Sequence, residues 1–332
     1  MMHGLFPYRL PPGGTVTAVT SPAIPGLEED AAGQRIPQRR RRWNRRQIGL
    51  AILLTAPNLL LLTFFVYRPL LDNIRLSFFD WNISSVRPPR FIGLQNYIEW
   101  ATTPASWQIV FQTVAFTATA VFGSMALGLG LAMLLDRKLR GRGLVRSLIF
   151  APYVISGAVI GVAFQFVFDP SYGLIQDLLH RVGLPSPDFY TDSFWAMFMI
   201  TATYVWKNLG YTFVIYLAAL QGLRQDLDEA AEIDRTSGLR KFLKVTLPQL
   251  RPTTFFLSIT VLLNSFQVFD IIHVMTGGGP YGTGTTTLVY QVYQETFVNN
   301  RAGYGAAVAT IMFLMVLVIT VIQVRWGDRK GR

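Results

Sequence analysis

The chain has 332 residues, of which 51% are hydrophobic and only 15% are charged, and its mean hydropathy is +0.34. In soluble domains about a quarter of all residues are charged, so an ordinary soluble enzyme is not expected. There is no cysteine and there are only three histidines, which argues against disulfides, thiolate chemistry and a histidine-rich metal site. The net charge of +11 is typical of either a nucleic-acid-binding protein or a membrane protein, and the positions of the basic residues decide between them.

Residues 1–46 are rich in proline and glycine and end in a run of arginines. They show almost no apolar periodicity, which predicts a disordered basic tail. The apolar stretch that follows starts too late and is too long for a cleavable signal peptide, so we expect the tail to be retained.

Six apolar stretches then reach the ~20 residues that a helix needs to cross a bilayer core of ~30 Å. They are Ile48–Tyr67, Ile109–Leu135, Ser147–Val167, Phe194–Leu220, Phe255–Met275 and Tyr304–Val324. Each stretch is continuously apolar, and a helix satisfies its own backbone hydrogen bonds in lipid, so helices are favoured over a β-barrel. The sequence predicts an all-α polytopic membrane protein with six transmembrane helices, a membrane domain over residues 47–326 and a short cytoplasmic tail at residues 327–332.

The basic residues are divided unevenly between the two sets of predicted loops. The set that holds both termini contains 23 of the 30 Lys and Arg residues, the opposite set contains 6, and Lys207 lies inside the fourth stretch. Cytoplasmic loops carry an excess of Lys and Arg, so both termini are predicted to be cytoplasmic. This distribution marks one face of a membrane and removes the support for nucleic-acid binding.

The longest predicted cytoplasmic loop covers residues 221–252. Asp226 and Asp228 precede a helix-forming stretch, apolar residues at helical spacing resume after Gly238, and Pro248 and Pro252 end the pattern. The loop is predicted to form two short helices with a turn between them. On periodicity alone, an amphipathic surface loop and a docking element fit equally well.

The loop also resembles the EAA loop of permease subunits of binding-protein-dependent ABC importers. The run Glu229-Ala230-Ala231, Asp234, Phe242, Leu247-Pro248 and Pro252 matches that spacing without a gap. The resemblance implies a coupling helix that sits in a groove of the ATPase subunit, with the coupling residues Glu229, Ala230, Ala231, Asp234, Arg235, Gly238, Phe242 and Pro248. The chain departs from the usual motif in having Arg235 where the family has glycine, and Gly238 is a candidate for the turn.

Two further segments are similar to carbohydrate-uptake permeases of the maltose-transporter kind, specifically the subunit resembling the maltose system's F protein. Residues 77–82 with 91–97 look like the first outer loop, and residues 269–280 with 285–293 look like the exit of the fifth span. Alone, Gly277–Pro280 is only a turn signal. The second segment resembles most closely the glycerol-3-phosphate branch of this family.

The resemblance implies a type I ABC importer permease fold in a bacterial cytoplasmic membrane, and it implies the partners. These are a second EAA-bearing permease subunit, a cytoplasmic ATPase dimer and an extracytoplasmic solute-binding protein, with lipid around the chain and no nucleic acid. No phosphate-binding loop occurs in the sequence. We therefore predict that the chain is not an enzyme and holds no cofactor, and that the partner ATPase binds ATP and Mg.

Polar residues inside membrane spans are costly and therefore mark candidate pathways. In the fourth span, Tyr204, Asn208 and Tyr211 share one helical face, and Lys207 lies beside them. The fifth span adds Asn264, Gln267 and Asp270 at three-residue steps. The resemblance implies that solute binds between these two spans, near Tyr211 and Asn264. Hydrogen bonds between helices, or a pairing of Lys207 with Asp270, would explain the same residues.

The polar face bears on the choice of solute. A cation such as Lys207 suits an anionic phosphate, whereas the aromatic residues near it suit a sugar ring. We therefore predict an importer permease for a sugar or glycerol-3-phosphate-type solute, with a neutral di- or oligosaccharide such as trehalose or maltose as the alternative. A secondary transporter would show internal repeats or a buried carboxylate or histidine relay, and only Asp270 with His273 suggests one. A membrane-embedded enzyme would need paired acids or an activated nucleophile at membrane depth, and none is seen.

Overall fold

The structure, a computed structural model, describes residues 45–84, 88–136, 142–223, 238–280 and 283–330. Residues 1–44 of the predicted tail (1–46) lie outside these ranges, whereas Arg45 and Arg46 are not disordered as predicted but form the start of helix α1. Contacts within the chain divide it into two units at Leu60, which are described separately. The described part of the first unit consists of helix α1 (Arg45–Leu62), which contains Pro57 and whose last two residues belong to the second unit.

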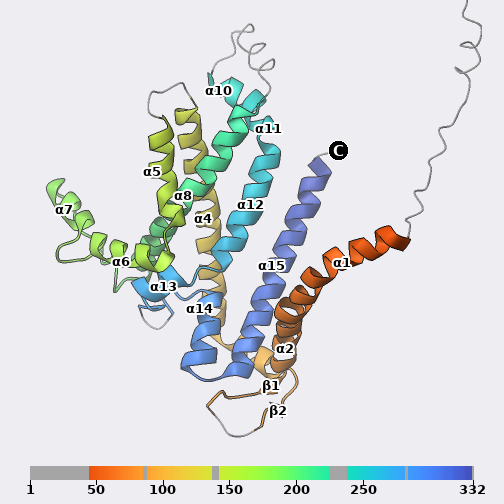
Figure 1. Cartoon of the computed structure of the whole chain (residues 1–332). Coiled ribbons are helices and arrows are strands. Elements are labelled where there is room, and N and C mark those ends of the chain that lie inside the picture. The colour runs from red at the N-terminus through yellow and green to blue at the C-terminus, as the bar shows by residue number, and fades with distance from the viewer. Residues whose placement is uncertain (1–44, 85–87, 137–141, 224–237, 281–282, 331–332) are drawn as a thin grey trace, which may run out of the picture. The chain divides into compact units, whose positions relative to one another are not determined.

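The second unit, from Leu61 onward, is built almost entirely of helices (Figure 1). Its first half holds the π-helical turn η1 (Thr63–Tyr67), α2 (Arg68–Leu76), the strands β1 (Phe79–Asp80) and β2 (Arg90–Phe91), α3 (Gln95–Thr102), α4 (Pro104–Leu135), α5 (Arg142–Val154), α6 (Gly157–Val167) and α7 (Leu174–Arg181). Its second half holds α8 (Ser193–Gln221), α10 (Gly238–Lys241), η2 (Phe242–Thr246), α11 (Leu247–Gln249), α12 (Arg251–Phe266), α13 (Asp270–Met275), α14 (Leu288–Tyr293), η3 (Gln294–Val298) and α15 (Ala302–Lys330). The two strands pair antiparallel, with Phe79 opposite Phe91.

Several of these helices are long and apolar enough to cross a membrane. In the described residues they are Ile52–Leu76, Pro104–Leu135 and Ala302–Gly327, which correspond to the first, second and sixth predicted spans. The fourth predicted span is the 29-residue helix α8, whose polar residues lower its hydropathy, and the fifth corresponds to α12, which has only 16 residues. The count of six spans stays a prediction.

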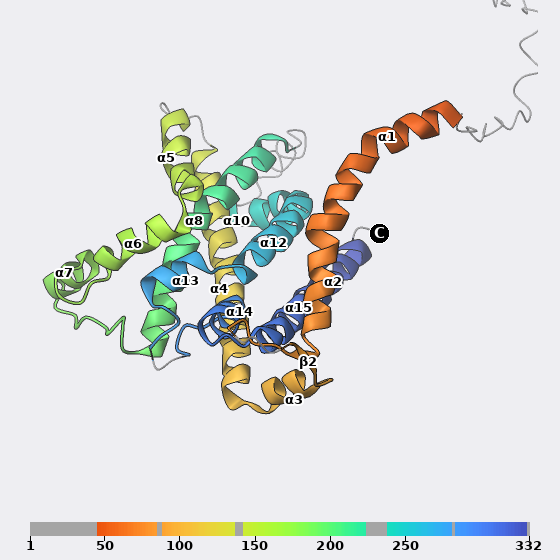
Figure 2. The ribbon, with the colours of Figure 1, turned by 60° about the horizontal axis from the view of Figure 1, so that its bottom comes forward.

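The third predicted span is not one straight helix. Residues 143–154 and 157–167 form α5 and α6, which meet at an angle of 101° (Figure 2). Pro152 has no backbone N–H to continue the helical bonding, and Ser156 takes an extended backbone conformation with ψ at 138°. The continuous apolar run concealed this corner, because hydropathy does not depend on backbone direction.

The fifth predicted span is also broken. Helix α12 ends at Phe266, and α13 begins at Asp270 after three residues that do not continue it. The polar residues Asn264 and Gln267 lie at this end of α12 and are exposed. An unwound segment within a predicted span is tolerated where it is covered by protein or lines a cavity.

The packing of α4 against α8 forms the centre of the second unit. Thr212 on α8 donates a hydrogen bond to the Ser124 carbonyl on α4 over 2.7 Å, and Gly128 leaves the room in which Thr212 sits. Phe116, Met199, Ile200, Ile271 and Ile272 are among the fully buried side chains of the adjoining core. Close approach at small residues is the usual way in which membrane helices associate.

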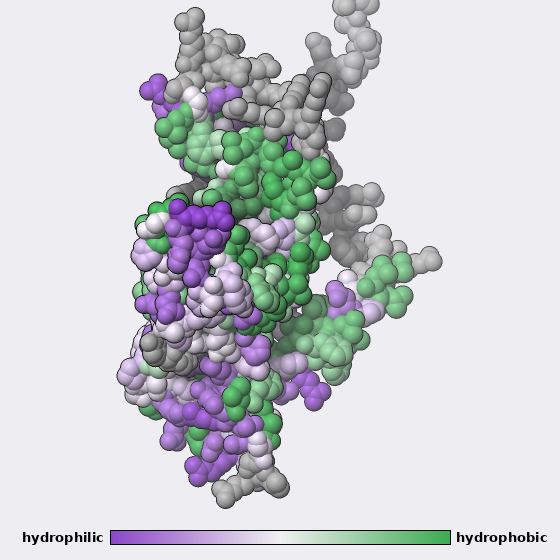
Figure 3. All heavy atoms as spheres, turned by 90° about the vertical axis from the view of Figure 1, so that its left-hand side faces the viewer, coloured by the Kyte–Doolittle hydropathy of each residue, from purple (hydrophilic) through white to green (hydrophobic). Residues whose placement is uncertain are grey.

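Many large apolar side chains are instead exposed on the outside of the helices. Phe122 on α4 is 76% exposed and Val159 on α6 is 61% exposed. Figure 3 shows hydrophobic surface gathered over the upper part of one side, with hydrophilic surface below it. Apolar surface of this extent is typical of lipid-facing or subunit-facing helices.

Substitution of Gly210 by valine is expected to destabilise the contact between α5 and α8. A side chain at Gly210 would overlap the backbone carbonyl of Ile149, which has little freedom to move, and such overpacking costs about 1–3 kcal/mol. Thermal unfolding in detergent should show a lower midpoint. Gly130→Val on α4 is the matched control because no atom lies within 4 Å of its Cβ position, and an equal loss in both variants would contradict this packing.

Candidate functional site

A cavity of about 340 Å³ lies among α5, α8, α12 and α13. The residues that line it are Tyr153, Tyr204, Lys207, Asn208, Asn264, Gln267, Val268, Asp270 and Ile271. Six of the seven residues that the sequence singled out as a polar pathway are in this set. The two polar stripes therefore face the same space.

Helix α8 supplies one wall through a single turn of the helix. Tyr204 and Asn208 are buried and Lys207 is half-buried between them. The amide nitrogen of Asn208 donates to the Tyr204 carbonyl over 3.0 Å, which fixes the amide and leaves its oxygen as an acceptor. A donor, an acceptor and an aromatic face are thus presented together.

The opposite wall comes from the break between α12 and α13. Gln267 is the C-cap residue of α12, with its backbone N–H bonded to the Asn264 carbonyl over 3.2 Å. Asp270 is the first residue of α13, and its carboxylate accepts from the backbone N–H of Ile271 over 2.9 Å. Asn264, Gln267 and Asp270 therefore border one cavity from the two sides of the break.

Tyr211 is the predicted pathway residue that does not line the cavity. Its ring stacks on Tyr153 with centroids 5.0 Å apart and an interplanar angle of 20°, and its hydroxyl donates to Thr260 Oγ1 over 3.3 Å. Tyr211 therefore makes the kind of interhelical contact that the sequence left open as the alternative. It bears on the cavity only through Tyr153.

Tyr153 is the lining residue that sequence reasoning missed. Lys207 Nζ donates to the Tyr153 carbonyl over 3.1 Å and lies 5.2 Å from the centroid of its ring. In the described part of the chain, Lys207 makes no ion pair with Asp270, so the alternative of a direct pairing between them is not formed. The signal that could have identified Tyr153 is Pro152 immediately before it, which marks where α5 loses its regular hydrogen bonding.

Arg301 shows how charges outside the predicted spans are satisfied. Its guanidinium donates to Glu99, lies 3.7 Å from a carboxylate oxygen of Glu295 and stacks 4.2 Å from the Tyr304 ring centroid. Burial opposes the charged form, but the hydrogen bond and charge of Glu99 together with Glu295 raise the pKa of Arg301 overall. This cluster of one guanidinium and two carboxylates joins α3, η3 and α15.

The glycine and threonine residues of the predicted outer loop form a compact turn. Gly277 and Gly278 have positive φ angles of 59° and 84°, which glycine adopts without strain. Thr285 Oγ1 donates to the Gly279 carbonyl over 2.6 Å, and Thr286 Oγ1 donates to the Gly278 carbonyl over 3.1 Å. The turn predicted at Gly277–Pro280 is confirmed.

The predicted coupling residues are only partly described. Glu229, Ala230, Ala231, Asp234 and Arg235 lie outside the described residues. Gly238 begins α10, Phe242 begins η2 and Pro248 lies within α11. Next to them, Leu239 is 71% exposed and Leu243 is 51% exposed. The described end of the loop therefore presents apolar side chains at its surface.

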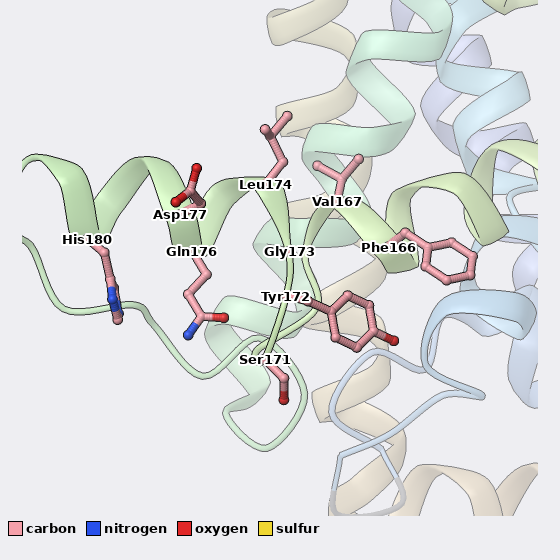
Figure 4. Close-up of a pocket in the computed structure, with 9 residues that line it drawn as sticks. All are labelled: Phe166, Val167, Ser171, Tyr172, Gly173, Leu174, Gln176, Asp177 and His180. Carbon is pink, nitrogen blue, oxygen red and sulfur yellow. The ribbon is translucent and has the colours of Figure 1, made fainter.

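A second hollow lies elsewhere, between the end of α6 and α7. It has a volume of about 600 Å³, and Figure 4 shows Gln176 and His180 on the same side of α7 with Tyr172 beside Phe166. Desolvation acts to raise the pKa of Asp169 in this turn, but hydrogen bonds from the backbone N–H groups of Ser171 and Tyr172 and from the Tyr172 side chain outweigh it and lower the pKa overall. None of the predicted pathway residues lines it.

Comparison with known proteins now identifies the family. The family described as "Binding-protein-dependent transport system inner membrane component" matches residues 124–331. The chain belongs to this family. The permease is 34% identical over 276 residues to the sulfoquinovosyl glycerol transport system permease protein of Agrobacterium fabrum, covering 83% of this chain and 89% of that one. It is also 34% identical over 282 residues to the sn-glycerol-3-phosphate transport system permease protein of the same organism, covering 85% and 95%.

A solved structure agrees with the fold. The permease matches a chain of a bacterial ABC transporter involved in the import of the acidic polysaccharide alginate, with a TM-score of 0.74, 20% identity and coverage of 87% of this chain and 98% of that chain. The all-α type I ABC importer permease fold predicted from the sequence is confirmed. The protein is an inner-membrane transport component that works with a solute-binding protein and an ATPase and has no ATPase site of its own.

Proposed function

We propose that the permease moves a sugar or glycerol-3-phosphate-type solute through the cavity between α8 and α12. The observation that supports this most strongly is the convergence of six predicted polar residues, from α8 and from the broken segment α12–α13, on one space of about 340 Å³. Polar groups inside a membrane are costly unless they are satisfied or serve a function. A cavity with an ammonium group, amides and aromatic faces suits a small hydroxylated solute.

The proposal favours an anionic solute. Lys207 places a positive charge at the cavity wall, and a phosphate group is a strong partner for such a charge. Two of the similar permeases carry names that refer to sulfoquinovosyl glycerol and to sn-glycerol-3-phosphate. The second candidate is a neutral di- or oligosaccharide, which is favoured by the aromatic rings of Tyr153 and Tyr204 at the same cavity.

The proposed assembly contains a second EAA-bearing permease subunit and a cytoplasmic ATPase dimer. ATP-driven closure of the ATPase acts on residues 221–252 and rocks the helices between inward-open and outward-open states. The proposal puts both termini in the cytoplasm, because the set of predicted loops that includes them contains 23 of the 30 basic residues. The exposure of Leu239 and Leu243 supports docking of this loop in a groove of a partner, because apolar side chains gain free energy when they are buried.

Uptake by the reconstituted complex tests the proposed solute. The complex should accumulate labelled glycerol-3-phosphate in vesicles, and Lys207→Ala should lower this uptake by about tenfold or more, since a charged hydrogen bond contributes about 1.5–3 kcal/mol. Lys207→Arg, which keeps the charge, should retain most of the uptake. Membrane levels of the variants serve as the control for folding.

Two results would contradict this assignment. Unchanged glycerol-3-phosphate uptake in Lys207→Ala would remove Lys207 from solute recognition. Uptake of a labelled disaccharide, with no uptake of glycerol-3-phosphate, would replace the anionic solute by the neutral one.

A further inference from the structure

The corner between α5 and α6 brings two helix ends of opposite polarity together beside the cavity. The C-terminal end of α5 carries carbonyl groups without helical partners, and the N-terminal end of α6 carries N–H groups without helical partners. In an uninterrupted helix, the Tyr153 carbonyl would accept from the N–H of residue 157. Gly157 instead begins α6, so both groups are released at the corner.

Lys207 takes the place of the missing donor at the end of α5. Its Nζ lies 3.1 Å from the Tyr153 carbonyl oxygen, at the penultimate residue of the helix. A positive charge at a helix C-terminus is favourable because it faces the negative end of the helix dipole. The contact also gives a hydrogen bond to a carbonyl that would otherwise be unsatisfied in the membrane.

Asp270 takes the corresponding place at the start of α6. Its carboxylate lies directly against the Cα of Gly157, so closely that any side chain at this position would overlap it. Ser156 is the N-cap residue of α6, yet its side chain makes no capping hydrogen bond. The negative charge at the positive end of α6 is therefore supplied by α13, which packs against α6 (Figures 1 and 2).

We propose that Lys207 and Asp270 are positioning residues that hold the α5–α6 corner, and with it one wall of the cavity, by placing opposite charges on its two helix ends. The inference rests on the proposed passage of solute through this cavity. It assigns to both residues a role that does not depend on which solute is carried. It also explains why the two side chains line one cavity without forming an ion pair: each faces a helix end.

Distance measurements between spin labels on α5 and α6 test whether Lys207 and Asp270 hold the corner. The chain has no cysteine, so Leu148→Cys and Val162→Cys, which are 64% and 46% exposed, provide the two label sites in an assembled complex whose other chains lack reactive cysteines. We expect a narrow distance distribution in the parent protein. Asp270→Asn and Gly157→Ala should each broaden or shift it and lower uptake about tenfold, whichever solute the parent complex takes up.

Matched variants separate this role from general damage. Gly130→Ala, at a helix position with nothing within 4 Å, should leave both readouts unchanged. Gly157→Ala should add nothing further in an Asp270→Ala background, because both changes remove the same contact. Lys207→Arg should keep the parent distribution and Lys207→Met should not, because only arginine can still donate to the Tyr153 carbonyl.

An unchanged label distance in Asp270→Asn would overturn the proposal. Because asparagine has nearly the same shape as aspartate, this variant can still be measured if Gly157→Ala fails to assemble. Failure of the proposed solute has a different signature. In that case the distance changes persist while glycerol-3-phosphate uptake is absent from the parent complex.

Discussion

Asn264→Trp is expected to abolish uptake while leaving the permease assembled in the membrane. Asn264 is exposed at the wall of a cavity of about 340 Å³, and an indole ring at this position would occupy the space between α8 and α12. Because every solute that follows this route meets the same obstruction, loss of transport should not depend on solute charge. Uptake into vesicles, normalised to the amount of assembled complex, measures the effect.

Phe256→Trp is the matched control for this prediction. Phe256 lies on the same helix, is 51% exposed and does not line the cavity. Its substitution should leave uptake within about twofold of the parent, because isolated surface changes usually alter stability by less than ~0.5 kcal/mol. Normal uptake in Asn264→Trp would show that solute takes another route.

Glu229→Lys is expected to separate ATP hydrolysis from transport. Under the proposed coupling role, Glu229 lies at the contact with the ATPase, where a reversed charge would replace an attraction by a repulsion. Uptake should fall to background while the complex continues to hydrolyse ATP. The two activities should be measured on the same reconstituted sample.

Two further variants define the coupling contact. Asp226→Lys reverses a charge in the same loop, before the predicted coupling helix, and should retain coupling. Leu243→Glu places a charge on a side chain that is 51% exposed in the structure, and it should weaken coupling if that apolar surface is covered by the partner. Normal transport by Glu229→Lys would count against the coupling role.

Helical periodicity explains why six of the predicted polar residues border one cavity. Tyr204 and Asn208 are four residues apart on α8, and Asn264 and Gln267 are three residues apart at the end of α12, so each pair shares a helix face. Tyr211 continues the same stripe by one more turn. Periodicity does not show where a cavity ends, and this is why Tyr211 was grouped with residues that it does not join.

The corner at residues 155–156 was beyond sequence reasoning based on hydropathy. Residues on both sides of it are apolar, so an averaged pattern gives one span where the structure has α5 and α6 at 101°. Because the corner was not predicted, the residues around it were also interpreted incompletely. Tyr153 was not singled out. A direct pairing of Lys207 with Asp270 was left as one alternative, whereas in the structure Lys207 contacts the end of α5 and Asp270 contacts the start of α6.

Solute protection of a cysteine in the cavity tests the central claim most directly. Gln267→Cys introduces a single thiol into a chain that has none, at an exposed position on the cavity wall, and Tyr172→Cys provides a 70% exposed position outside it. If solute passes between α8 and α12, saturating transported solute will slow modification of Gln267→Cys by a water-soluble thiol reagent and leave Tyr172→Cys unaffected. Equal modification of Gln267→Cys with and without solute, in a complex that still transports, would contradict the account.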